Sequence, residues 1–227
     1  MSNKSMRRIA YDWLKKQIIS LDFPMGSCLV ESTLCQELDM GRTPVREALQ
    51  QLASEGLVTI LPRKGIFVSN INFTDFENLI EVRIMLETHV VRRLARNRVL
   101  VGGVDPDRLQ QIRALFDNVA DLVEAGDIDA LLVIERKFHQ GLVALLNNPL
   151  FDDLAEHIFD LVTRTWYLSF KNRTKQDLAE TLQENLDVFE KVCQGDAQAA
   201  EDAIVEHVMN FRSKVFHQPH VYYYQHP

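Results

Sequence analysis

Polar side chains interrupt the apolar stripes of four predicted helices in the second part of the chain. Glu135 and His139 lie four residues apart, which places them about 40° from each other on the apolar face of one helix. His207, Asn185 and Arg83 each lie within the apolar stripe of a different helix. Such groups are costly to bury unpaired, so they should contact one another, water, a metal ion or a ligand.

Two kinds of chemistry fit these side chains. A carboxylate and imidazoles are ligands for zinc, nickel or manganese, and the i,i+4 spacing of Glu135 and His139 lets one helix supply two of them. Arg83 is suited to binding a carboxylate ligand through two parallel hydrogen bonds. The alternative is structural, because a buried His is usually a hydrogen-bonded core residue and Arg83 can pair with Glu87 one turn away. Periodicity alone leaves both interpretations open.

The elements that must position these residues are all helical. Apolar spacing predicts helices at 74–97, 105–125, 128–147, 150–171, 175–194 and 197–216. Glycine, proline and asparagine separate them, as at Gly102-Gly103 and Asn147-Asn148-Pro149. No strand pattern follows Ser69, so we expect an antiparallel bundle of about six helices. The segment 217–227 has no period and is expected to be a flexible tail.

The first 70 residues show a different order of elements. A helix at 6–21 and a short helix around Leu34 precede a third helix, for which Thr43 is the expected N-cap and Pro44 the first residue. Gly56 ends it, and two β-rich runs at 57–61 and 66–69 then flank a turn. The order predicts a winged helix-turn-helix. We therefore expect a mainly α protein with a DNA-binding domain at 1–70, a linker at 71–73 and an all-helical effector-binding and dimerisation domain at 74–216.

Composition and charge narrow the class of protein. The 227 residues are 46% hydrophobic and 25% charged, as in a soluble globular protein. Residues 1–70 carry 9 Lys and Arg against 7 Asp and Glu, whereas the rest carries 16 against 25, so a mildly basic head precedes an acidic body. No apolar run predicts a membrane span or secretory signal. Three scattered cysteines favour reduced thiols in a cytoplasm, with a redox sensor as the less favoured alternative.

The predicted third helix and the following turn carry the cations that could contact DNA. Arg42 at the helix start could read guanine, and Arg46 on the polar face could hold a phosphate. Arg63 and Lys64 in the turn would reach the backbone or the minor groove, and Gly65 allows close approach. Each residue alone also fits a solvated amphipathic helix and a charged turn, but their order favours DNA.

Residues 6–70 resemble the GntR family of bacterial transcription regulators. The resemblance is carried by Pro24-Met25-Gly26-Ser27-Cys28-Leu29-Val30-Glu31, Gly41-Arg42-Thr43-Pro44-Val45-Arg46-Glu47-Ala48-Leu49, Leu52-Ala53-Ser54-Glu55-Gly56-Leu57-Val58 and Arg63-Lys64-Gly65-Ile66-Phe67-Val68. It implies DNA contacts from Arg42, Thr43, Arg46, Arg63, Lys64 and Gly65. The family usually has a small polar residue where this chain has Gly41, so one phosphate contact is expected to be missing.

Residues 74–216 resemble the C-terminal effector (FCD) domain of the FadR subfamily. The matching strings are Arg83-Ile84-Met85-Leu86-Glu87, Glu135-Arg136-Lys137-Phe138-His139, Gly195-Asp196 and Ala203-Ile204-Val205-Glu206-His207. Many members bind a divalent metal through an Asp and three His beneath a pocket for a small carboxylate. The resemblance implies metal ligands at Glu135, His139, Asn185 and His207, with Arg83 binding the effector.

Two of these positions depart from the family pattern. Glu135 replaces Asp and keeps the ligand chemistry, whereas Asn185 replaces His and offers only a neutral amide oxygen. We therefore expect weak or water-completed coordination of Zn, Ni or Mn. His157 matches no ligand position and is expected in the pocket or the core.

The leading hypothesis is a cytoplasmic, ligand-responsive repressor that binds a double-stranded DNA operator as a homodimer, with a small organic acid as effector and no membrane partner. The alternative is a metal-dependent enzyme that uses Glu135, His139 and His207. The sequence lacks HExxH, a second obvious general base and a nucleotide-binding glycine loop, so an enzyme is not favoured. A structural interaction module would leave the polar stripe residues unused.

Overall fold

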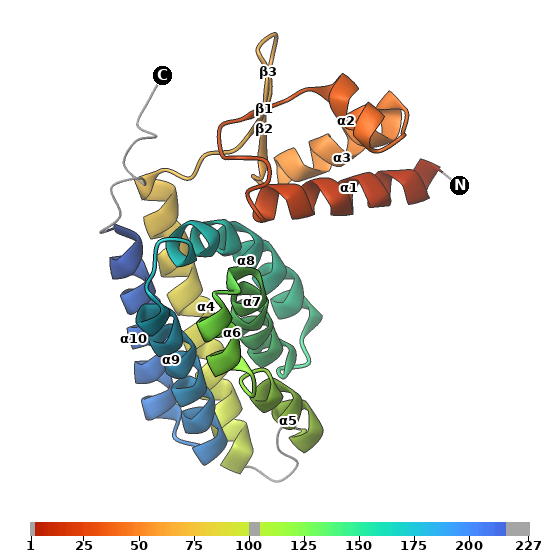
Figure 1. Cartoon of the computed structure of the whole chain (residues 1–227). Coiled ribbons are helices and arrows are strands. Elements are labelled where there is room, and N and C mark those ends of the chain that lie inside the picture. The colour runs from red at the N-terminus through yellow and green to blue at the C-terminus, as the bar shows by residue number, and fades with distance from the viewer. Residues whose placement is uncertain (1–2, 100–104, 217–227) are drawn as a thin grey trace. The chain divides into compact units, whose positions relative to one another are not determined.

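The computed structural model describes residues 3–99 and 105–216, and the chain divides between Asn72 and Phe73 into two compact units (Figure 1). Within those ranges, no helix combines the length and apolar character that crossing a membrane requires. The predicted tail at 217–227 lies outside the described residues.

The first unit contains three helices and a three-stranded sheet. Its elements in chain order are α1 (Asn3–Ile19), β1 (Cys28–Leu29), α2 (Glu31–Glu37), α3 (Arg42–Ser54), β2 (Val58–Leu61) and β3 (Gly65–Val68). The antiparallel strands lie in the order β1-β3-β2, with Val58 opposite Val68 and Cys28 opposite Phe67. The winged helix-turn-helix expected from the sequence is confirmed. The strand β1 was not expected, because two residues carry no measurable period.

The start of α3 corrects one prediction. The helix begins at Arg42, and its N-cap is Gly41, which has no side chain to accept a capping bond. Thr43 therefore lies in the first turn and is not the N-cap. Val45, Ala48 and Leu49 are fully buried, and α3 packs with this face against α1. The opposite face of α3 is left for contacts outside the chain.

The turn between β2 and β3 holds its cations outward. Lys64 N–H donates to the carbonyl of Leu61 (3.1 Å), and Arg63 between them adopts a left-handed φ of 64°. Proline at the second position and a positive φ at the third are the marks of a type II turn. Arg63 and Lys64 are both exposed.

The second unit is a helical bundle. Its elements are α4 (Phe73–Val99), α5 (Pro106–Ala114), α6 (Val119–Ala125), α7 (Ile128–Ala144), α8 (Pro149–Phe170), α9 (Lys175–Gln194) and α10 (Ala197–Phe216). The single helix expected at 105–125 is wrong, because it is two helices. Between them the backbone tightens to i,i+3 bonds at Leu115 and Phe116. The Phe116 ring packs edge-on against Phe138, 5.5 Å away between centroids, so a tertiary contact overrides the local helical pattern.

The long helix α4 runs through this bundle. It contacts α9 and α10 on one side and α7 and α8 on the other (Figure 1). The core around it is aromatic, with Phe138, Phe159 and Trp166 fully buried. Five polar residues singled out from the sequence are enclosed in the same core: Arg83, Glu135, His139, Asn185 and His207.

Candidate metal and effector site

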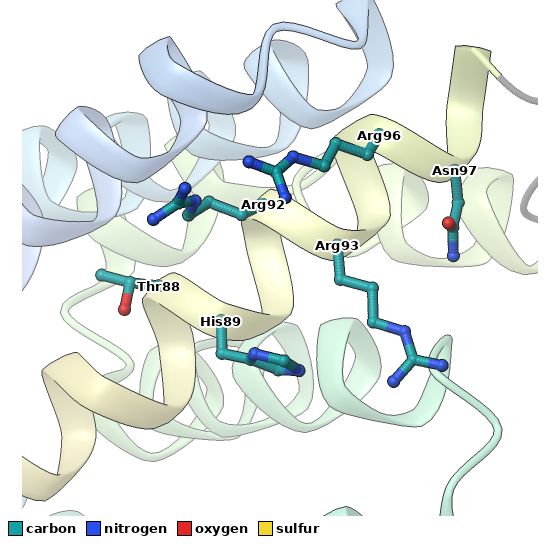
Figure 2. Close-up of a pocket in the computed structure, with 6 residues that line it drawn as sticks. All are labelled: Thr88, His89, Arg92, Arg93, Arg96 and Asn97. Atoms are coloured by element: carbon teal, nitrogen blue, oxygen red, sulfur yellow. The ribbon is translucent and has the colours of Figure 1, made fainter.

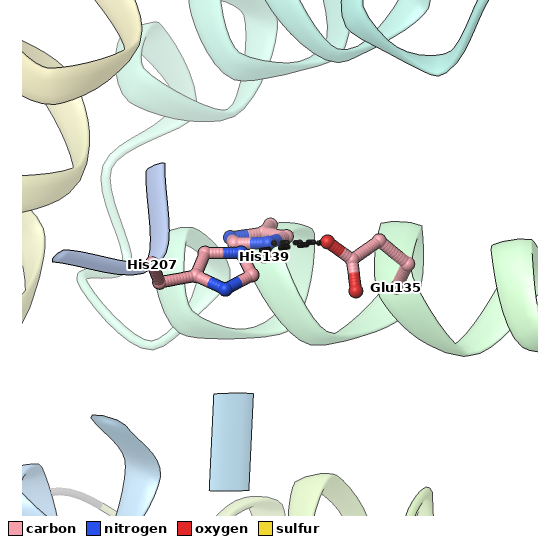
Figure 3. Close-up of side chains that lie close together, drawn as sticks. All are labelled: Glu135, His139 and His207. Atoms are coloured by element: carbon pink, nitrogen blue, oxygen red, sulfur yellow. Dashed lines mark hydrogen bonds and ion pairs between the residues drawn. The ribbon is translucent and has the colours of Figure 1, made fainter. Parts of the chain in front are cut away.

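Three potential metal ligands meet in the core of the second unit. Glu135 and His139 project from α7 toward His207 of α10 (Figure 3), and their ligand atoms all lie within 4.8 Å of one another. Nε2 of His139 lies 3.4 Å from Oε1 of Glu135, and Nε2 of His207 lies 3.5 Å from the same oxygen. Each of the three residues is 1% exposed. The i,i+4 spacing therefore delivers two groups to one point, and α10 supplies the third.

Two further carboxylates lie beside the imidazole rings. Nδ1 of His139 lies 2.7 Å from Oε2 of Glu87 on α4, and Nδ1 of His207 lies 3.0 Å from Oε2 of Glu184 on α9. A carboxylate that accepts a hydrogen bond from one ring nitrogen fixes the tautomer that leaves the other nitrogen as a ligand. The hydrogen bond between Nδ1 of His207 and Glu184 thereby directs Nε2 of that ring to Glu135. Nδ1 of His139 lies near Glu87 but without the geometry of a hydrogen bond. Sequence reasoning placed neither carboxylate beside these rings.

Asn185 supports Glu135 from the neighbouring helix α9. Its Nδ2 donates to Oε2 of Glu135 over 2.6 Å, and its Oδ1 has no hydrogen-bond partner among the described residues. The amide therefore holds one carboxylate oxygen in place. It also keeps a buried acceptor, which costs free energy unless something else pairs with it.

Arg83 lies in the same cluster. Its Nη2 donates to Nε2 of His139 over 2.9 Å, and its Nε makes an ion pair with Glu87 one helical turn away. The guanidinium carbon lies 5.1 Å from the ring centre of Trp166 and 5.6 Å from that of Phe211. Nη1 has no hydrogen-bond partner within the described part of the chain. Arg83 therefore pairs with Glu87 and still has one donor, Nη1, that could bind a ligand.

The site retains its negative charges despite burial. Burial alone would raise the pKa of Glu87, but the charges of Arg83 and His139 outweigh it and lower the pKa to about 2. Burial likewise opposes ionisation of Glu135, but the neighbouring imidazoles of His139 and His207 hold its pKa well below the usual value. For His207, burial lowers the pKa, and the neighbouring carboxylates of Glu135 and Glu184 reverse this to give a raised pKa.

A second arginine, which sequence reasoning missed, lies beside the cluster. Arg173 follows α8 and donates from Nη1 to the Thr181 hydroxyl (2.7 Å), whereas Nε and Nη2 have no partner among the residues described. Its guanidinium carbon lies 6.0 Å from the ring centre of Phe211, the ring that Arg83 also contacts. Burial lowers the pKa of Arg173, and nearby Glu135 and Glu184 oppose that shift. A position just beyond a helix end carries no periodicity that could have revealed it.

The residues present fit a divalent metal ion. One carboxylate and two imidazoles form a donor set that zinc, nickel or manganese accepts. Nε2 of His207 and Oδ1 of Asn185 are buried without hydrogen-bond partners in the described structure, which an ion or its bound water would supply. Glu135, His139 and His207 would hold the ion, and it would offer open positions to an acid ligand.

The candidate DNA-binding residues gather in the first unit. Arg42, Thr43 and Arg46 are exposed in the first turns of α3. Arg46 is held by Glu31 of α2 through two hydrogen bonds, of 2.9 Å from Nη2 and 3.1 Å from Nε. Gly65 at the start of β3 adopts a φ of 124°, which other residues rarely adopt. The exposed start of one helix and an exposed cationic turn have the form of a DNA-reading surface.

The structure also describes His157 and the three cysteines. His157 is exposed on α8, so its expected place in the pocket or core is wrong. Cys28, Cys35 and Cys193 are all free thiols. The histidines beyond residue 216 lie outside the described residues.

Comparison with known proteins identifies the family. Residues 7–68 match the family described as bacterial regulatory proteins, gntR family, and residues 78–210 match the FCD domain. The chain is a GntR-family transcriptional regulator with an FCD domain. The resemblance inferred from the sequence is therefore confirmed for both parts. Relatives in this family are regulators, which points away from an enzyme.

Similar proteins cover nearly the whole chain. The HTH-type transcriptional repressor RspR of Escherichia coli (strain K12) is 26% identical over 205 residues, which cover 90% of this chain and 86% of RspR. The uncharacterized regulator YdhC of Bacillus subtilis (strain 168) is 27% identical, with coverage of 93% and 90%. The solved structure of E. coli McbR/YncC has a TM-score of 0.81 at 19% identity and covers 96% of this chain and 99% of its own, which shows a shared fold.

Proposed function

We propose that this GntR-family regulator is a repressor that binds a two-fold DNA operator as a homodimer and is controlled by a small organic acid. Repressors occur among its relatives, as the names of RspR and of the gluconate operon repressor of Bacillus subtilis state. Two-fold operators follow from the symmetry of a dimer with one reading helix per subunit. The acid would shift the helical domain between arrangements that fit the operator and arrangements that do not.

The paired imidazoles support a metal-dependent effector site. Both Nδ1 atoms face carboxylates, and both Nε2 atoms lie about equally far from Oε1 of Glu135. Nε2 of His207 is buried without a hydrogen-bond partner among the described residues, and an ion between the two rings and Glu135 would supply one. Glu135, His139 and His207 are therefore the proposed ligands of Zn, Ni or Mn, and Asn185 is a weak fourth ligand through Oδ1.

The acid is assigned to the cationic side of the cluster. Nη1 of Arg83, Nε and Nη2 of Arg173, and Nε1 of Trp166 are buried donors that lack partners within the described residues. Buried guanidinium donors are costly to leave unsatisfied, and a carboxylate accepts from them in pairs. Arg83 and Arg173 also share the Phe211 ring, so one small anion could contact both. The effector class that fits is a small carboxylic acid with a second group for the metal.

The first unit supplies the DNA contacts in this proposal. Arg42 and Thr43 at the exposed start of α3 would contact base edges, and Arg46 would contact a phosphate after leaving Glu31. Arg63, Lys64 and Gly65 would lie against the sugar-phosphate backbone or in the minor groove. These contacts require the start of α3 to enter the major groove, which a helix-turn-helix fold allows.

Elemental analysis of untagged protein tests the site first. We expect about one equivalent of a divalent metal in the parent protein, the same in His157→Ala, and less than a tenth of that in His139→Ala. His157 is a matched control because it is an exposed histidine on a neighbouring helix. Equal metal in His139→Ala and the parent would contradict the assignment. Absence of metal from all three would mean that Arg83, Arg173 and the histidines bind the acid directly.

A panel of small mono-, di- and hydroxy-carboxylic acids then tests the effector class. The expected result is a rise in the unfolding midpoint with one or a few acids, which Arg83→Gln and Arg173→Gln abolish. Release or tightening of an operator selected from random DNA by the same acids would link the site to regulation. Stabilisation by amines or neutral sugars instead of acids would contradict the proposed effector class.

A further inference from the structure

One of the cations expected to contact DNA is already bound by a carboxylate of its own chain. Glu31, the first residue of α2, accepts from Nη2 (2.9 Å) and Nε (3.1 Å) of Arg46, so the two groups are joined by a pair of parallel hydrogen bonds. The side chain of Arg46 is 59% exposed and that of Glu31 is 21% exposed. The pair therefore lies at the surface of the first unit, where a DNA phosphate could reach the same guanidinium.

The two helices that supply this pair are fixed to each other. Leu34, three residues after Glu31, is buried, and α2 packs against α3. Arg46 lies in the second turn of α3, whose apolar face packs against α1. An isolated surface ion pair contributes little, because two long side chains must be held in one geometry, but a bidentate pair between fixed helices is the favourable case. The pairing of Glu31 with Arg46 is therefore a built feature of the unit.

Other exposed cations of the chain have no such partner. Arg42, Arg63 and Lys64 make no ion pair with the residues that the structure describes. The same holds for Arg93 and Arg96 of α4, which line a cavity of about 490 Å³ with their guanidinium groups directed apart (Figure 2). Among the candidate DNA-contacting cations described here, the charge of Arg46 is thus the one that a carboxylate neutralises.

A DNA phosphate would bind the same guanidinium by the same chemistry. Phosphate and carboxylate both accept parallel hydrogen bonds from an arginine, and Glu31 already uses Nε and Nη2 of Arg46. A phosphate that approached the remaining nitrogen, Nη1, would meet a cation balanced by a nearby carboxylate, and the two anions would repel each other. In either geometry, Glu31 weakens the attraction between Arg46 and DNA.

We propose that Glu31 is an intramolecular competitor of DNA phosphates for Arg46 and thereby limits the affinity of this regulator for DNA. The phosphates are the same in every DNA sequence, so Glu31 sets the affinity for operator and unrelated DNA alike. Discrimination between sequences is left to the residues that contact bases. The inference rests on the proposed phosphate contact of Arg46, and it names the residue that opposes this contact.

Fluorescence anisotropy with a duplex of random sequence tests the competition. Glu31→Gln keeps the size of the side chain and removes its charge, and it should bind this duplex about five- to tenfold more tightly at low salt, with a smaller gain at high salt. Glu37→Gln is the matched control, because Glu37 is an exposed carboxylate at the other end of α2 without an ion pair to the described residues. It should tighten binding by about twofold or less. Weaker binding by Glu31→Gln would overturn the inference, because Glu31 would then hold Arg46 in place for DNA.

Combination with Arg46→Ala separates competition from the loss of a negative charge alone. In a chain that already has Arg46→Ala, Glu31→Gln should tighten binding no more than Glu37→Gln does, because the competition needs both partners. An equal gain with and without Arg46 would overturn the inference, since Glu31 would then repel DNA directly. The expected result is a gain in affinity, which a misfolded chain cannot produce.

The same variants distinguish this inference from the phosphate contact on which it rests. Arg46→Ala should bind the random duplex more weakly than the parent protein does. If Arg46→Ala binds equally well, the phosphate contact is wrong and the competition fails with it. If Arg46→Ala binds more weakly and Glu31→Gln matches the parent, the phosphate contact is retained and the competition alone is overturned.

Discussion

Arg83 donates from Nη2 to Nε2 of His139 over 2.9 Å, and it thereby uses the lone pair that a metal ion would need. Metal binding at His139 therefore requires Arg83 to move or turn its guanidinium away. A carboxylate that draws Arg83 toward itself would free Nε2 for the ion. The acid and the metal would then each strengthen binding of the other, because such coupling is reciprocal.

Arg83→Gln should raise the affinity for Zn²⁺ or Ni²⁺ in the absence of acid by about tenfold, because a nearby positive charge and a competing donor are both removed. The same variant should lower the unfolding midpoint, since Glu87 loses its buried partner. Chelator-competition titrations below the unfolding transition measure the affinity. Arg173→Gln is the control, because Arg173 is a half-buried cation in the same region that makes no bond to His139. Weaker metal binding by Arg83→Gln would contradict the competition.

Glu184→Gln should weaken metal binding by about 10- to 100-fold without removing any ligand. Its carboxylate holds Nδ1 of His207, and a glutamine can present its amide group there instead and favour the wrong tautomer. The exposed Glu180 lies one turn earlier on α9 and bonds Gln176, so Glu180→Gln is a matched control. Equal affinities of the two variants, measured by competition with a chelator, would show that Glu184 does not orient His207.

Asn185→His should raise the affinity for Zn²⁺ or Ni²⁺ by about tenfold or more, because an imidazole is a far better ligand than an amide oxygen. It would also leave Glu135 as the one position that departs from the ligand set that the resemblance to the FadR subfamily implies. Asn185→Ala provides the comparison, since it removes the hydrogen bond to Glu135 and adds no ligand. If Asn185→His binds metal no better than Asn185→Ala, the α9 position does not face the ion.

The raised pKa of His207 predicts the pH dependence of the metal-free protein. Protonated His207 stabilises the fold below its unfolded-state pKa, near the usual value of 6.5, and this contribution is lost as pH rises through the raised folded-state pKa. The unfolding midpoint of chelator-treated protein should therefore fall over that range, and His207→Gln should remove the fall. Metal-loaded protein should show the opposite slope, because the ion binds the deprotonated ring. Identical pH profiles of His207→Gln and the parent would contradict this assignment.

Arg42→Ala and Arg46→Ala should affect DNA binding differently. Loss of Arg42 should cost about 1–3 kcal/mol of discrimination between operator and mutated operator, because Arg42 is expected to read a base. Loss of Arg46 should weaken both by a similar factor and lower the salt slope by about one, because it is expected to hold a phosphate. Fluorescence anisotropy at several salt concentrations separates the two roles. Unchanged discrimination in Arg42→Ala would show that another residue reads the sequence.

The sequence predicted those parts of the fold whose signals are local. Apolar spacing located the helices of the bundle, and the turn residues Pro62 and Gly65 located the hairpin. The break between α5 and α6 was not predictable, because it depends on Phe116 meeting Phe138 from another helix. The same limit applied to the site. Glu135 and His139 share one helix face, whereas the roles of Glu87, Glu184 and Arg173 arise only when distant segments meet.

The turn of the hairpin places a charged residue, Arg63, in a conformation that lowers folding stability. Arg63 adopts a φ of 64°, and a left-handed conformation costs an L-residue other than glycine about 1–2 kcal/mol. Glycine or asparagine would fill this position of a type II turn more easily. A purely stabilising design would choose Arg63→Gly. This substitution should therefore stabilise the hairpin and weaken binding of the operator. With the proposed DNA contact of Arg63, thermostability and operator affinity become opposing objectives at this residue, and engineering of the protein has to choose between them.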